Sequence, residues 1–196
     1  GGAFPSRGSR GSAVKITAIA LNTFREAVRD RILYSILAFA LLLIGASTIL
    51  ASLSIGQEGR IVKDLGLAST SLFGTFIAIF LGIGLVFKEI ERRSIYAIIS
   101  KPIHRFQFLL GKYIGLVLTL VSTVGMMALL VAGLAWAIDG HWTAGLLGAA
   151  ALDFLALMIV TAVALLFSTF STPTLSAIFT LAIFVIGRLS GDLKLF

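Results

Sequence analysis

Asp153 is the ionisable residue that stands well inside a long apolar stretch, residues 142–170. A carboxylate at membrane depth is costly, so such a residue normally faces a bundle interior or a water-filled cavity. If the helix starts at an interface marked by His141 and Trp142 and follows the membrane normal, Asp153 lies about 16 Å deep. Asp153 is therefore a candidate gate or substrate contact. The alternative is a protruding helix that leaves Asp153 near the lipid headgroups.

The segment 88–112, KEIERRSIYAIISKPIHRFQFLLGK, is the most charged part of the chain and gives the second functional signal. It opens with charges of both signs and then returns to apolar residues before Pro102, which disfavours further helix. A solvated loop does not need those apolar residues. A short cytoplasmic helix with an apolar face indicates either a protein partner or the membrane surface.

Motifs for catalysis and for metal binding are missing from the sequence. Neither GxxxxGK[ST], HExxH nor GxSxG occurs, so we do not expect the chain itself to bind ATP or to use these chemistries. Without cysteine there is no disulfide and no thiolate metal site. His104 and His141 fall on opposite sides of the predicted membrane and cannot share a metal within one chain. We expect no catalytic residue, no cofactor and no metal site.

The composition determines the class of protein. The 196 residues are 58% hydrophobic and only 13% charged, whereas soluble domains carry about 25% charged residues. In lipid, backbone polar groups are satisfied only in helices or closed barrels. The apolar runs are too long and too poorly alternating for barrel strands. We predict an all-α, polytopic transmembrane helix bundle.

Transmembrane helices must position Asp153 and the loop 88–112. They are predicted from the apolar stretches, which are roughly long enough to cross the hydrocarbon. Five spans are predicted near residues 32–53, 66–87, 113–138, 142–170 and 174–189. Gly111 and Gly115 begin the third with a GxxxG spacing, which permits close helix contact. Residues 13–31 predict an amphipathic interfacial helix, or alternatively a soluble extension of the first span. We expect residues 1–12 to be a flexible tail and 13–196 a single transmembrane domain.

The orientation follows from the positive charges. Twelve of the 16 Lys and Arg residues lie in the N-terminal segment and in the loop 88–112, which two crossings place on the same side. Such residues accumulate in the cytoplasm. We therefore expect the N-terminus and this loop to be cytoplasmic and the end of the fifth span to lie outside. The same grouping accounts for the net charge of +7 without nucleic acid.

The loop and the N-terminal segment TFREAVRDRILY together resemble the permease subunits of ABC-2 type transporters. The matching pattern is an acidic–basic cluster followed by a Ser-Lys-Pro turn, an arginine and a Gly-Lys pair. Its residues are Glu89, Glu91, Arg92, Arg93, Ser100, Lys101, Pro102, Arg105, Gly111 and Lys112. The resemblance covers about half of the chain. It is strongest to the multi-copper enzyme maturation branch, typified by the nitrous-oxide-reductase maturation permease.

This resemblance implies a separate cytoplasmic ABC ATPase subunit, which would carry the ATP and Mg. Residues 88–101 would then be the coupling helix that docks on the ATPase, and residues 13–31 the interfacial connecting helix. The coupling residues that the resemblance implies are Glu89, Glu91, Arg92, Arg93, Ile95, Tyr96, Lys101 and Pro102. ATP-driven closure of the ATPase would rearrange the bundle, which requires a rigid element with two arrangements.

The resemblance also implies a homodimer or a pair of permeases in a bacterial or archaeal cytoplasmic membrane. The family usually has six spans, so with five predicted here we expect a last span to be missing. Two other functions stay open. One is a membrane scaffold that recruits a cytoplasmic partner through the same loop without transport. The other is a membrane-embedded enzyme that uses Asp153, which is the weakest because no second polar catalytic group is evident at similar depth.

Overall fold

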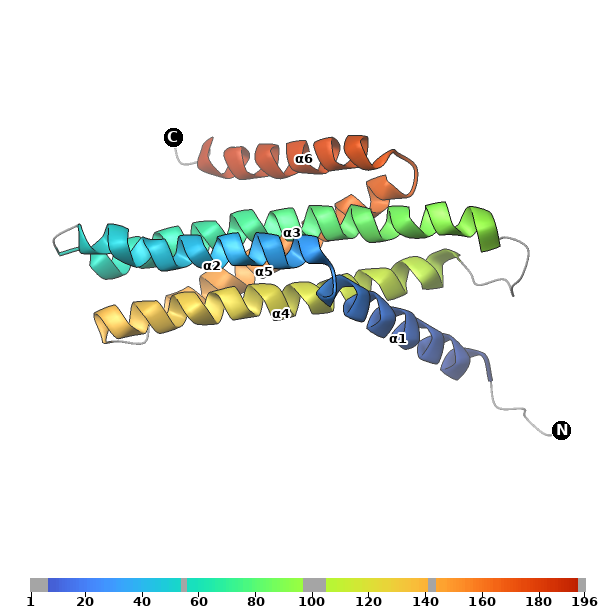
Figure 1. Ribbon diagram of the computed structural model, residues 1–196, viewed down its shortest axis with the longest axis horizontal. Helices are drawn as coiled ribbons and strands as arrows, with labels where there is room; N and C mark the ends of the chain where they lie inside the picture. Colours follow the sequence, from blue (N-terminus) through green and yellow to red (C-terminus); the bar gives the residue numbers. More distant parts are fainter. Residues whose placement is uncertain (1–6, 54–55, 97–104, 141–143, 194–196) are drawn as a thin grey trace.

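The computed structural model describes residues 7–53, 56–96, 105–140 and 144–193, and these form a bundle of helices (Figure 1). The helices are α1 Arg7–Val28, α2 Arg31–Ser52, α3 Glu58–Tyr96, α4 Arg105–Asp139, α5 Ala144–Ser168 and α6 Pro173–Leu193. The predicted all-α fold is thus confirmed over the described ranges. α1 begins at Arg7, so residues 7–12 of the expected tail are helical. α3 begins at Glu58, so most of the polar segment before the second predicted span is helical as well.

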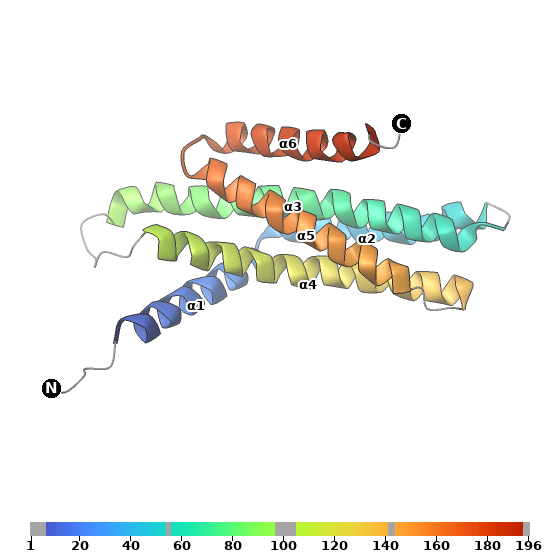
Figure 2. The same ribbon diagram turned by 180° about the vertical axis from the view of Figure 1, so that it is seen from behind.

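The helices α2 to α6 run back and forth along one common direction, and α1 lies obliquely beside the first part of α4 (Figure 1). The end of α3 and the beginnings of α1 and α4 lie at the same end of the bundle as the turn between α5 and α6 (Figure 1). We call this the loop end. At the opposite end, which we call the far end, α2 and α4 end, α3 and α5 begin, and α6 runs towards it. Seen from behind, α5 crosses α3 and α4 diagonally (Figure 2).

Within the described residues, four helical segments are long and apolar enough to cross a membrane, judged by length and composition. They are Arg31–Ser52, Glu58–Phe87, Phe108–Asp139 and Gly145–Ser168. The fifth predicted span corresponds to the apolar part of α6, Pro173–Leu189, which is shorter. At 1.5 Å per residue this part reaches about 26 Å, slightly less than the hydrocarbon thickness of a typical bilayer.

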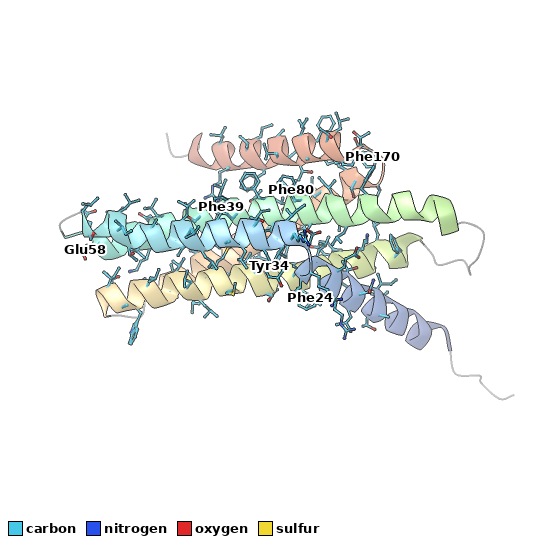
Figure 3. All side chains as sticks on the ribbon, viewed as in Figure 1. Phe24, Tyr34, Phe39, Glu58, Phe80 and Phe170 are labelled. Carbon is cyan, nitrogen blue, oxygen red and sulfur yellow. The ribbon has the colours of Figure 1, made fainter. Side chains whose placement is uncertain are left out.

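α3 is the inner helix of the bundle and packs against α2, α4, α5 and α6. In its apolar window 67% of the residues are buried, against 28% in α2 and in α5, so those two helices present most of their surface outward. Large apolar side chains such as Phe39, Phe80 and Phe170 are more than half exposed and project from the helices (Figure 3). Apolar side chains on the outside are what a hydrocarbon solvent requires.

Glycines bring α3 close to its neighbours. A Cβ atom at Gly66 would lie 2.6 Å from Val131 Cγ1 of α4, and one at Gly74 would lie 2.6 Å from Leu157 Cδ1 of α5. Real Cβ atoms do not come so near. A Cβ at Gly66 would force the stiff Val131 side chain, and with it α4, to move, whereas a Cβ at Gly74 would require the flexible end of Leu157 to shift. Small residues at helix contacts are typical of membrane proteins, because close backbones gain more van der Waals contact.

The glycine pair predicted from GxxxG spacing makes a close helix contact, and its partner is α1. A Cβ atom at Gly115 would lie 2.6 Å from the backbone oxygen of Ala20, and one at Gly111 would lie 2.8 Å from Ile19 Cβ. On α1 the buried side chains near this contact are small, Ala20 and Thr23. α1 is therefore seated directly on the backbone of α4 near the loop end.

The contact of Gly115 can be tested with alanine. Gly115→Ala should push α1 away from α4 and lower the free energy of unfolding by about 1–3 kcal/mol, the usual cost of overpacking. Gly125→Ala, on the same helix with nothing within 4 Å of its Cβ position, should be neutral or slightly stabilising. Thermal unfolding of the purified protein in detergent would measure both. Equal unfolding temperatures for the two variants would contradict the close contact.

Candidate functional site

Asp153 faces the bundle interior, where it meets side chains of two other helices. Its carboxylate Oδ1 lies 3.9 Å from Nη1 of Arg188 on α6, and the same nitrogen donates a hydrogen bond of 3.0 Å to Ser71 Oγ on α3. The Asp153 side chain is only 12% exposed, while that of Arg188 is 58% exposed. Asp153, Ser71 and Arg188 thus form a three-helix polar cluster. This agrees with the prediction that Asp153 faces a bundle interior or a cavity.

The polar cluster lines a cavity of about 460 Å³ between α3, α5 and α6. Its remaining wall is mostly small or apolar, with Leu67, Ala68 and Leu152 among the lining residues, and Asp64 contributes a second carboxylate. Asp64 belongs to the second turn of α3, at the far end, and its side chain is 71% exposed. The cavity therefore extends from the far end of the bundle inward to the polar cluster.

One atom of the polar cluster lacks a partner. Oδ2 of Asp153 is buried and accepts no hydrogen bond from any residue in the described part of the chain. A buried polar atom without a partner is costly and needs an explanation. The polar cluster therefore contains one hydrogen-bond acceptor for which the described residues supply no donor.

Sequence reasoning identified Asp153 but missed its partners. Ser71 and Arg188 contact the same site, and the sequence analysis names neither of them as a partner of Asp153. A usable signal was present: Asp153 and Arg188 lie at similar distances from the turn at residues 169–172, so antiparallel helices place them side by side. No such sequence signal identifies Ser71, because α3 and α5 are not consecutive helices and no single turn relates their residues.

The loop end carries the residues that the resemblance assigns to coupling. α3 continues without a break through residues 88–96, and these include six of them: Glu89, Glu91, Arg92, Arg93, Ile95 and Tyr96. Lys101 and Pro102 lie outside the described residues. The predicted short helix after the second span is therefore the end of α3 itself.

Lys112 is a buried cation near the loop end that sequence reasoning treated only as part of the charged loop. Its side chain is among the largest fully buried ones, at 1% exposure. Nζ donates a hydrogen bond to the backbone oxygen of Leu85 on α3 and lies 5.4 Å from the ring centroid of Phe108. The ring face and the carbonyl both stabilise a cation. Lys112 thereby joins α4 to α3 where the two helices leave the apolar region.

A second charged contact joins α3 and α4 at the far end. Lys63 Nζ lies 2.5 Å from Asp139 Oδ2, and Gly59 leaves the space that the Asp139 side chain fills. The α3–α4 pair is thus connected by charged groups at both ends and by glycine contacts between them. Among the described residues no group of three His, Cys, Asp or Glu side chains could hold a metal ion.

The buried position of Lys112 predicts an order of stability for two variants. Lys112→Met keeps most of the apolar volume and loses the donor, whereas Lys112→Ala also leaves a void in the packed interior. We expect unfolding temperatures in the order wild type, Lys112→Met, Lys112→Ala, with Lys112→Ala destabilised by about 2–4 kcal/mol. Thermal unfolding in detergent gives the order. An alanine variant as stable as the wild type would show that Lys112 does not hold the helices together.

The contact between Asp153 and Arg188 can be measured with a double-mutant cycle. Asp153→Asn, Arg188→Gln and the double variant should show a coupling energy of about 1 kcal/mol or more, because the pair lies in a partly dehydrated cavity. The matched cycle with Arg60→Gln and Asp64→Asn removes an exposed pair at 3.8 Å and should give about 0.3–0.5 kcal/mol. Coupling no larger than in the exposed pair would argue against the polar cluster.

Comparison with known proteins places the chain in a family. The family model described as ABC-2 family transporter protein matches residues 17–193, which cover nearly all of the described helices. No curated protein matches the chain. The match includes both the polar cluster and the loop end. The chain therefore belongs to the ABC-2 family of transporter proteins, as an integral membrane permease subunit of an ABC transporter.

Proposed function

We propose that this chain is the membrane subunit of an ATP-driven ABC-2 type exporter and that its loop end docks on a separate cytoplasmic ATPase. The observation that carries the proposal is the length of α3 and α4. They contain 39 and 35 residues, about 58 and 52 Å, whereas about 20 residues cross the hydrocarbon. Both helices extend past α2 at the loop end (Figure 1). A pair of helices that extends out of the bundle and bears charges of both signs suits a docking element.

The α3–α4 pair is also suited to transmit a displacement. Lys112 ties the two helices near their exit from the apolar region, and the Lys63–Asp139 contact ties them at the far end. Gly66 against Val131 keeps them in close contact between those points. A push on the loop would therefore move both helices together. Since α3 also lines the cavity with Ser71, the movement would reach the polar cluster.

Several further properties belong to this proposal. ATP and Mg would bind to the partner ATPase and not to this chain. The N-terminus and the loop end would face the cytoplasm of a bacterial or archaeal cell, as the distribution of Lys and Arg favours. The permease would act with a second permease copy. The nitrous-oxide-reductase maturation branch is the proposed subgroup, on the loop pattern from Glu89 to Lys112.

Site-specific crosslinking tests the docking. The chain has no cysteine, so Ser94→Cys introduces a single thiol in the helical segment 88–96. In native membranes we expect this thiol to crosslink to an ABC ATPase, with a yield that changes when ATP is added, because closure of the ATPase would move the docking helix. Mass spectrometry of the crosslinked band identifies the partner.

Gln57→Cys is the matched control, since Gln57 is exposed immediately before α3 at the far end of the bundle. It should give no crosslink to the ATPase. A crosslink from Ser94→Cys to a protein of another class would support a scaffold in place of a transporter. Equal crosslinking from both thiols, or none from Ser94→Cys in a folded and inserted protein, would contradict docking at the loop end.

A further inference from the structure

The cavity beside the polar cluster continues into an apolar groove. A second cavity of about 300 Å³ lies between α5 and α6, and its lining includes Ile159, Val163, Ile183 and Phe184. Both cavities are lined by Ala156 and Arg188, so they meet at that point. The two cavities are therefore adjacent, and we refer to them together as the cleft. Its charged part lies towards the far end, and its apolar part follows the α5–α6 pair towards the loop end.

The charged part of the cleft suits a ligand that itself carries charges. The guanidinium of Arg188 contacts Ser71 and Asp153 through one nitrogen and is still 58% exposed, so the rest of its N–H donors are open to a ligand in the cavity. The residues that line the cavity include two carboxylates, Asp64 and Asp153, and Arg188 is the one cation among them, so the net formal charge of the lining is negative; Arg60, the exposed partner of Asp64, lies outside the lining. A purely anionic head group would be repelled by the carboxylates, and a purely cationic one would compete with Arg188. A zwitterionic head group fits both signs.

The hydrogen-bonding groups of Arg188 and Asp153 indicate which zwitterionic head group fits best. A guanidinium matches the geometry of phosphate oxygens, with which it can form two parallel hydrogen bonds. The carboxylate of Asp153 has an oxygen without a donor. A primary ammonium supplies N–H donors to such carboxylates, whereas a quaternary ammonium of the same charge supplies none.

We propose that the cleft between α3, α5 and α6 binds a phospholipid with a primary ammonium head group, such as phosphatidylethanolamine. Its phosphate pairs with Arg188, its ammonium donates to Asp153 and is attracted by the charge of Asp64, and one acyl chain lies along Val163 and Phe184. This site is argued from α3, α5 and α6 alone and stands apart from the docking of an ATPase at the loop end.

Native mass spectrometry of the full chain, purified in detergent, tests the proposal. The protein is incubated with phosphatidylethanolamine, phosphatidylcholine or phosphatidylglycerol that carry identical acyl chains. We expect phosphatidylethanolamine to be retained about tenfold better than phosphatidylcholine, the order expected for loss of a charge-assisted hydrogen bond. Phosphatidylglycerol should also bind less well, because it lacks the ammonium. Equal retention of all three would overturn the proposal.

Variants separate the head-group site from ordinary lipid contact. Asp64→Asn and Asp153→Asn should reduce the preference for phosphatidylethanolamine over phosphatidylcholine, and Arg188→Gln should reduce retention of all three lipids. Asp64 is largely exposed, so its variant is expected to fold even if the others do not. A preference that survives Asp64→Asn and Asp153→Asn in folded protein would refute the ammonium contact.

A matched pair of tryptophan variants tests the apolar groove as the site of the acyl chain. Val163→Trp fills the groove and should lower retention of phosphatidylethanolamine, while Leu129→Trp adds the same side chain at a position of α4 that is 71% exposed and outside the cleft. Identical retention by these two variants would exclude the groove. A purified dimer that holds no lipid and crosslinks between copies across Arg188 would show that a second copy covers the cleft, and would overturn the proposal.

Discussion

The bundle depends on how closely α3 can approach its neighbours. Helices in lipid gain little by hiding apolar surface from each other, because the lipid tails are equally apolar, so contact area and polar links decide which helices associate. Gly66 lets α3 approach α4 to a distance at which a Cβ would collide with Val131, and at Gly74 the Leu157 side chain of α5 fills the space that a Cβ would take. With α3 fixed in this way, Ser71 comes to face Asp153 and Lys112 reaches the carbonyl of Leu85. The polar cluster and the loop-end tie are both consequences of the same close packing.

Much of the fold could be predicted from the sequence, because membrane thickness and hydropathy restrict it strongly. The apolar stretches were located correctly, and the GxxxG pair at Gly111 and Gly115 does make a close contact. The GxxxG spacing does not identify α1 as the partner. Glycines on one face predict that another helix comes close, but they do not indicate which helix. The length of α3 was also underestimated. Residues 58–65 belong to α3 although their charge and polarity predict a connection before the span. The helix predicted at the start of segment 88–112 is the continuation of α3 through residues 88–96.

The candidate site was only partly accessible from the sequence. Asp153 could be singled out because charge inside an apolar run is unfavourable unless something compensates it. Its partners Ser71 and Arg188 belong to other helices, and which faces of those helices meet is a tertiary property. Lys112 was hidden for a different reason. A lysine at the end of a span normally extends to the interface, and nothing local indicates that a carbonyl of α3 will receive it.

The seating of α1 on α4 has a consequence for biosynthesis. Thr23 and Gly115 touch in the finished protein, yet the ribosome completes the second long after the first; at 5–20 residues per second the delay is roughly 5–20 s. During that interval α1 has no protein surface to rest on, while α2 and α3 are already being inserted. Its contact face combines the small residues Ala20 and Thr23 with Ile19, and this face stays uncovered during the delay. Docking of α1 is therefore a late event in assembly, and a nascent chain that stops before Gly115 lacks the surface to which α1 belongs.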